Sequence, residues 1–198
     1  MSQHTLGPFV IFFAAMFTNN ILLTNYLGMC PYIAVSRQVK AAVGLGAAVT
    51  FVMTCTSALN YVVYHRLLVP FGLEYLRFIA FIVVIAAFVQ FAEMAIDRLS
   101  PALYNALGIF LPLITVNCAI LGANLFMIIR RYDFWRSVAF GCGSGLGWML
   151  AILALAGIRQ KIEKAPIPEA LAGPAQAFII TGIMAMAFTG FTGMIPIE

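Results

Sequence analysis

The sequence has little charge. Only 9% of its 198 residues are Asp, Glu, Lys or Arg, whereas 63% are hydrophobic, and the mean hydropathy is +1.01. A water-soluble chain of this length needs more polar side chains to cover its surface. The composition therefore predicts an integral membrane protein and excludes an ordinary soluble domain.

Residue types that ligate metals or act as nucleophiles are also scarce, with four cysteines, two histidines and seven acidic residues. No glycine-rich dinucleotide loop follows a strand pattern and no Ser-His-Asp arrangement is visible, so neither an NADH or flavin site nor a hydrolytic site is predicted on this chain. The eleven Lys and Arg are scattered in short loops. That distribution argues against a nucleic-acid partner and indicates charges that flank membrane spans.

The apolar segments number about six, and each is near the ~20 residues that one bilayer crossing requires. They cover residues 8–35, 39–64, 77–97, 101–129, 135–158 and 174–196. The first is too long for one straight crossing, which favours a broken or re-entrant path. We therefore expect an all-α, multi-pass membrane protein surrounded by lipid.

Two cysteines lie beside helix breakers inside these spans. Cys30 precedes Pro31, and because proline disfavours the helical conformation of the residue before it, the helix should break at Cys30 itself. Cys118 lies within residues 111–122 among a proline, an asparagine and a glycine. Broken backbone is tolerated at membrane depth only where protein buries it or it lines a cavity. The sequence thus predicts that the fold brings Cys30 and Cys118 together.

The two halves of the chain show a weak repeat. Cys30 matches Cys118, and residues 42–51 resemble residues 139–148, two runs whose small residues fit close helix packing. Each half then holds three spans, an odd number, which forces the halves into opposite orientations. We expect one membrane domain over residues 1–198 with inverted repeats at about 8–98 and 100–196. The Lys and Arg are divided almost equally between the two sides, so charge does not fix the orientation.

A cysteine in an apolar span usually acts as a small hydrophobic residue, and Cys55 and Cys142 are interpreted in that way. Cys30 and Cys118 differ because both lie at breaks and at matching places of the repeat. A disulfide between them and a zinc site are the weaker alternatives. A soft, all-thiolate site favours an iron–sulfur cluster, which needs about four cysteine ligands. Two ligands on this chain imply that a second chain supplies the others.

A thiolate-ligated cluster is negatively charged, and charge inside a bilayer is costly unless fixed dipoles meet it. Helices that begin near Cys30 and Cys118 would point their positive ends and free N–H groups at the sulfurs. This gives the helix breaks a physical purpose.

Other polar residues in the spans have two interpretations each. Glu93 is either an interfacial carboxylate paired with arginine or a ligand on a sodium path. Asn20, Asn25 and Asn117 are expected to bond the freed backbone near the breaks rather than to bind an ion directly.

Three stretches carry a resemblance to a known family. They are residues 27–36, which begin with LGMC, residues 104–120, which contain TVNC, and residues 143–152, which begin with GSGLGW. They closely resemble the E subunit of the sodium-translocating NADH:quinone oxidoreductase, whose sister is the A subunit of the Rnf ferredoxin:NAD oxidoreductase. Pro31 and the asparagine pair at 19–20 are more like the Rnf sister. The second half is more like the E subunit, which we favour.

The resemblance implies a partner and a cofactor. In this family the chain pairs with a paralogous membrane subunit of inverted topology, the D subunit in the quinone reductase, within a six-subunit complex of the bacterial cytoplasmic (inner) membrane. The pair holds one [2Fe-2S] cluster with two cysteines from each chain, and the motifs place these at Cys30 and Cys118 here. The cluster carries electrons across the membrane, and the redox flow drives Na⁺ export. FAD, FMN and riboflavin are expected only on other subunits.

An alternative of a different class stays open. Inverted repeats with broken helices also build transporters and channels, in which the breaks cradle a substrate and the cysteines are incidental. Such a protein has no redox centre, so iron content separates the two hypotheses.

Overall fold

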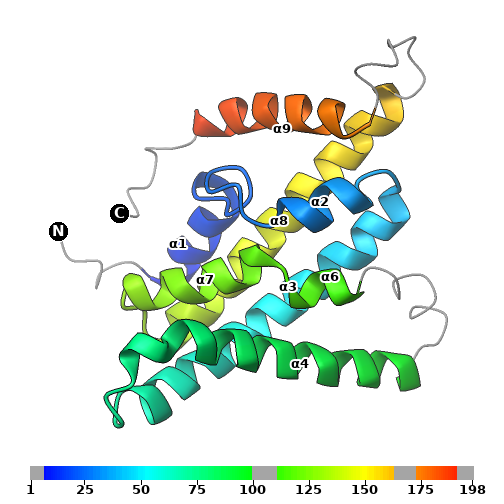
Figure 1. Ribbon diagram of the computed structural model, residues 1–198. Helices are drawn as coiled ribbons and strands as arrows, with labels where there is room; N and C mark the ends of the chain where they lie inside the picture. Colours follow the sequence, from blue (N-terminus) through cyan, green and yellow to red (C-terminus); the bar gives the residue numbers. More distant parts are fainter. Residues whose placement is uncertain (1–6, 100–110, 163–172, 191–198) are drawn as a thin grey trace.

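The computed structural model describes residues 7–99, 111–162 and 173–190, and its regular structure over these residues is helical (Figure 1). This confirms the predicted fold class. Within these described ranges, three helices are long and apolar enough to cross a membrane: Val39–Leu68, Glu74–Met94 and Phe134–Ile162. Three shorter apolar helices accompany them: Pro8–Thr18, Leu113–Ile129 and Pro174–Thr189.

The first predicted span is broken, as expected, but the break lies before Cys30. Helix α1 (Pro8–Phe13) continues through a π-helical turn, Ala14–Thr18, and the next helix, α2, covers Met29–Val35. The prediction that the helix breaks at Cys30 itself is wrong. Pro31 lies in the first turn of α2, where a missing N–H removes no helical hydrogen bond, so the proline starts a helix rather than ending one.

The remaining helices follow the predicted spans closely. They are α3 (Val39–Val63), with a π-helical turn at Tyr64–Leu68, α4 (Arg77–Leu99), which follows a 3₁₀ turn at Glu74–Leu76, α6 (Leu111–Thr115), α7 (Cys118–Ile129), α8 (Phe134–Ile162) and α9 (Pro174–Thr189). The apolar pattern ends before Arg159, but this residue still belongs to α8. The predicted start of the fourth span, near residue 101, and the end of the sixth lie outside the described residues.

Helices α3 and α8 pack along each other through the centre of the molecule (Figure 1). Helix α4 lies against α3 and α9 lies against α8, on opposite sides of this pair. Helix α1 packs on α8, and α7 packs on α3, α4 and α8. Each half therefore contributes a broken helix and a long central helix to a shared interior. The inverted symmetry of the halves stays a prediction.

Alternate glycines let α8 approach two neighbours at once. A Cβ atom added at Gly145 would lie 2.7 Å from Thr50 Cα of α3, and one added at Gly143 would lie 2.5 Å from the Phe12 carbonyl oxygen of α1. The small-residue run of the fifth span predicts close helix packing, and these contacts confirm it. Trp148, three residues beyond Gly145 on the same helix, is fully buried.

Candidate functional site

Asn20 holds the first helix break together. Its Oδ1 accepts hydrogen bonds from the N–H groups of Leu22 and Leu23, at 3.1 and 3.4 Å. Its Nδ2 donates to the carbonyl oxygens of Gly147 and Met16, at 2.8 and 3.3 Å. Asn20 is itself buried, so one amide bonds three backbone groups of the interrupted first helix and ties the break to a carbonyl oxygen of α8.

Asn117 organises the second break in a similar way. Helix α6 ends at Thr115, and α7 begins at Cys118 with Asn117 as its N-cap. The Asn117 Oδ1 accepts a hydrogen bond from the Ala119 N–H at 3.0 Å, as N-cap side chains do. The Asn117 Nδ2 is buried and has no hydrogen-bond partner among the described residues. A free donor therefore lies one residue from the Cys118 thiol.

The two breaks meet at Gly28. Its N–H donates to Cys118 Sγ at 2.9 Å, and its carbonyl oxygen accepts a hydrogen bond from Trp148 Nε1 at 3.3 Å. Gly28 has φ = 84°, a left-handed conformation that favours glycine. A Cβ atom added there would lie 2.7 Å from Trp148 Nε1 and 2.9 Å from Ala119 Cβ. Both its conformation and the close approach of its neighbours therefore require glycine.

The structure places Cys30 in the first turn of α2, two residues after Gly28, and Cys118 at the start of α7. Both are exposed, whereas Cys55 and Cys142 are partly buried, and all four cysteines are free thiols. The segments that carry Cys30 and Cys118 are thus in contact, and both present a cysteine on the surface. Among the described residues, no three His, Cys, Asp or Glu side chains gather into a metal site.

The surroundings of these cysteines suit thiolates. Helix α7 has 12 residues, and its positive end begins at Cys118, where a helix dipole stabilises negative charge. The Gly28 N–H already donates to that sulfur, and the unpartnered Asn117 amide is a further donor. Helix α2 has only seven residues, so its dipole is weaker. These groups fit the surroundings that two cysteine ligands of an iron–sulfur cluster would need.

Arg159 supports α2 from the opposite end, and sequence reasoning missed it. It is buried on α8, and its Nη1 donates to Ser36 Oγ at 2.6 Å and to the Ile33 carbonyl oxygen at 3.3 Å. A guanidinium at the C-terminal end of a helix satisfies its last carbonyls and complements its dipole. Arg159 therefore fixes the short helix that carries Cys30.

Two of the predicted residues lie apart from these contacts. Glu93 is half-buried on α4, and the described side chains include no ion pair for it, so its pairing with arginine is not seen. Asn25 lies in the first break and is half-buried. No side-chain hydrogen bond of Asn25 is found within the described part of the chain, in contrast to Asn20 and Asn117.

The sequence matches the family described as "Rnf-Nqr subunit, membrane protein" over residues 8–195. The chain belongs to the Rnf-Nqr family. In this Rnf-Nqr protein, two helix breaks meet at Gly28, and the helix that follows each break has one exposed cysteine in its first turn.

Relatives of two kinds are about equally similar to this Rnf-Nqr protein. The E subunit of the Na⁺-translocating NADH-quinone reductase of Serratia proteamaculans is 51% identical over 198 residues, which cover 97% of this chain and 98% of the relative. The E subunit from Neisseria gonorrhoeae is also 51% identical, with the same coverage. The A subunit of the Na⁺-translocating ferredoxin:NAD⁺ oxidoreductase complex of Acetobacterium woodii is 50% identical over 184 residues, 93% of this chain and 96% of the relative. These relatives are subunits of oxidoreductase complexes.

Proposed function

We propose that this chain is the E-type subunit of a Na⁺-translocating NADH:quinone oxidoreductase in a bacterial cytoplasmic membrane. It carries electrons across the membrane through a [2Fe-2S] cluster shared with a paralogous membrane subunit, and this electron flow is coupled to Na⁺ export. The observation that carries the proposal is the pair of exposed cysteines, Cys30 and Cys118, each in the first turn of the helix that follows a break. A hydrogen bond from the Gly28 N–H to Cys118 Sγ joins the two breaks.

Each residue has a distinct task in this proposal. Cys30 and Cys118 hold the cluster as thiolates, and the Gly28 N–H stabilises negative charge on Cys118 Sγ. The Asn117 amide offers a second donor nearby. When bound, the cluster accepts and releases single electrons. NADH, FAD, FMN and riboflavin belong to other subunits.

The exposure of both cysteines supports a partner that covers them. A thiolate facing lipid lacks the hydration that it has in water, which makes an uncovered pair costly. Iron–sulfur clusters need about four cysteine ligands, and no third ligand gathers near these cysteines among the described residues. A paralogous chain of inverted topology would both supply the missing cysteine ligands and bury the site.

Substitution of the cysteines in the intact complex tests the proposal. Cys30→Ser and Cys118→Ser should each remove the iron, the acid-labile sulfide and the electron paramagnetic resonance signal of this cluster. Cys55→Ser and Cys142→Ser are matched controls, because these half-buried cysteines lie on α3 and α8 away from the breaks, and both should retain the signal. The transporter alternative would be favoured instead if the wild-type complex had no iron at this site and both cysteine variants still transported ions.

The second candidate is the A subunit of an Rnf complex, favoured by the 50% identity to the Acetobacterium woodii protein. The electron donor separates the two. Membranes that contain the quinone reductase should reduce quinone with NADH, whereas membranes that contain an Rnf complex should reduce NAD⁺ with reduced ferredoxin.

A further inference from the structure

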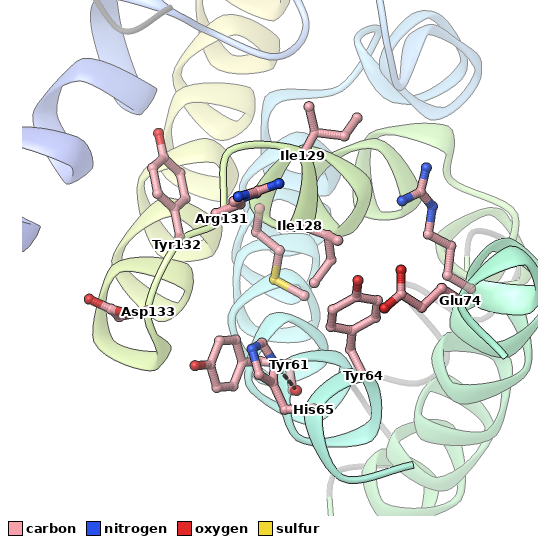
Figure 2. Close-up of a pocket in the computed structure, with 11 residues that line it drawn as sticks. Tyr61, Tyr64, His65, Glu74, Ile128, Ile129, Arg131, Tyr132 and Asp133 are labelled. Carbon is pink, nitrogen blue, oxygen red and sulfur yellow. Dashed lines mark hydrogen bonds between the residues drawn. The ribbon is translucent and has the colours of Figure 1, made fainter. Parts of the chain in front are cut away.

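A polar pocket of about 510 Å³ opens at one end of the helix bundle (Figure 2). Its walls come from the end of α3, the 3₁₀ turn and start of α4, the end of α7 and the turn before α8. The polar lining residues used below are Tyr61, Tyr64, Glu74, Arg77, Arg131 and Asp133. The pocket is not near either helix break, so the proposed redox site does not account for it.

The ends of two helices that are long and apolar enough to cross a membrane place the pocket at the membrane surface. One membrane-crossing helix, Val39–Leu68, ends at the pocket, and the next, Glu74–Met94, begins there. Tyrosine and arginine side chains are enriched at this depth, where an apolar stem and a polar tip both find a suitable environment. A ligand in the pocket would therefore reach both water and the hydrocarbon edge.

The lining has a small excess of positive charge, because two arginines face the single carboxylate of Glu74 once Asp133 is counted with Arg136. Asp133 lies 3.6 Å from Arg136, while Arg77 and Arg131 have no acidic partner within the described part of the chain. Figure 2 shows Arg131 extending over the pocket, and Glu74 turned toward Tyr64. Two guanidinium groups without carboxylate partners, together with tyrosine hydroxyls, form a donor set suited to phosphate.

Arg131 occupies a backbone position that favours glycine. It follows the C-cap of α7 with φ = 51°. Its N–H donates to the Ile128 carbonyl oxygen at 3.0 Å, and the Tyr132 N–H donates to the Met127 carbonyl oxygen at 3.0 Å. These two bonds form a Schellman motif, in which glycine is the usual residue. A long cationic side chain held in a strained conformation over a pocket points to a use for its guanidinium.

We propose that this pocket binds the headgroup of an anionic phospholipid, with the phosphate between Arg77 and Arg131. The acyl chains would lie along α4, where Phe78, Ile79 and Ile82 follow Arg77 and are exposed. Basic pockets between membrane helices bind anionic headgroups by this combination of charge and adjoining apolar surface. The site is independent of the redox function and stands even if the cluster is absent.

The test uses the intact complex after its lipids have been removed in mild detergent. The complex is titrated with phosphatidylglycerol, phosphatidylcholine or inorganic phosphate. Native mass spectrometry then counts the lipid molecules that stay bound. Wild type should retain phosphatidylglycerol in preference to phosphatidylcholine. Arg77→Gln and Arg131→Gly should each weaken this retention about fivefold. Arg131→Gly relieves the backbone strain, so its thermal stability should not fall below that of wild type. Arg37→Gln, which removes an exposed arginine outside the pocket, is the control and should bind as wild type.

Three results would overturn the proposal. Equal retention of both lipids would show no selection for an anionic headgroup. Displacement of phosphatidylglycerol by inorganic phosphate at equal concentration would assign the pocket to the free ion. A segment of another subunit seated in the pocket, seen in a structure of the complex, would replace lipid as its occupant.

Discussion

The residue that connects both halves of the candidate site is Gly28. Its N–H reaches Cys118, its carbonyl oxygen accepts from Trp148, and its Cα has no room for a side chain. The peptide orientation at Gly28 therefore depends on an indole that lies 120 residues further along the chain. Trp148 acts on the sulfur only through this peptide, which makes it a positioning residue.

Trp148→Phe should make the midpoint potential of the cluster more negative. Phenylalanine keeps most of the buried ring but loses the N–H that holds the Gly28 carbonyl, so the Gly28 N–H bond to Cys118 Sγ weakens. Hydrogen bonds to a ligand sulfur stabilise the reduced, more negative state. A weakened bond should shift the potential on the order of tens of millivolts, measured by a redox titration of the resonance signal.

The other tryptophan provides the matched control. Trp135 is 73% exposed at the start of α8, so Trp135→Phe should leave the potential unchanged. Iron content must match wild type in both variants, because a loss of iron would indicate misfolding rather than tuning. Equal potentials in Trp148→Phe and wild type would show that the indole does not act on the cluster.

At this scale the sequence indicates which residues are unusual but not which residues they contact. Cys30 and Cys118 were recognisable because each lies beside a local helix breaker. Gly28 and Arg159 were not, because their roles come from partners distant in sequence: Arg159 reaches Ser36 across 123 residues. An arginine at the end of an apolar run is typical of a membrane-flanking charge, and only the hydrogen bonds of its guanidinium to Ile33 and Ser36 show otherwise.

At the scale of elements, α8 determines how tightly the bundle closes. Gly141 and Gly145 face α3, where added Cβ atoms would lie 2.5 Å from Ser57 Oγ and 2.7 Å from Thr50 Cα. Gly143 and Gly147 face the first helix, with the carbonyl oxygens of residues 12 and 16 at 2.5 and 2.8 Å. Two interleaved small-xxx-small motifs thus pack one helix against two neighbours.

Gly143→Ala should destabilise the protein. The added methyl group would overlap a backbone carbonyl of α1, which cannot move away as a flexible side chain can, and overpacking of this kind costs about 1–3 kcal/mol. The loss is measured as a lower unfolding temperature in detergent.

Gly157→Ala is the control on the same helix, because no atom lies within 4 Å of its added Cβ. That variant should be neutral or up to ~1 kcal/mol more stable, since alanine favours the helix, and a similar loss in both variants would contradict the packing argument.

The elements themselves were largely predictable because a bilayer dictates the length of apolar helices. The bounds of α3 and α4 follow directly from the apolar runs. The first break was misplaced because a proline can either stop a helix or occupy its first turn. The residues that decide between these outcomes are not adjacent to Pro31: they are Asn20, which satisfies the freed backbone upstream, and Arg159, which caps the far end of α2.

At the scale of the whole molecule, the candidate site is on the surface of this chain rather than enclosed by it. Both cysteines are exposed, and the neighbouring Val116 is 81% exposed. An exposed apolar residue beside two thiols in a membrane protein is suited to contact another subunit. The sequence predicted half a ligand set, but no single chain can show the face of the partner that completes it.

The chain purified alone should therefore hold no cluster. Iron and acid-labile sulfide should both return when the chain is co-expressed with a paralogous membrane subunit that carries the same kind of cysteine motif. Two thiolates cannot complete a site that requires about four, and the described residues offer no further ligand beside them. Iron and sulfide are measured chemically on both preparations, and helicity by circular dichroism verifies that the isolated chain is folded. Co-expression with a partner whose motif cysteines are replaced by serine is the control and should leave the pair without iron. Stoichiometric iron and sulfide in the isolated chain would instead mean that two copies of this chain assemble the site between themselves, and the role of a paralogue would have to be abandoned.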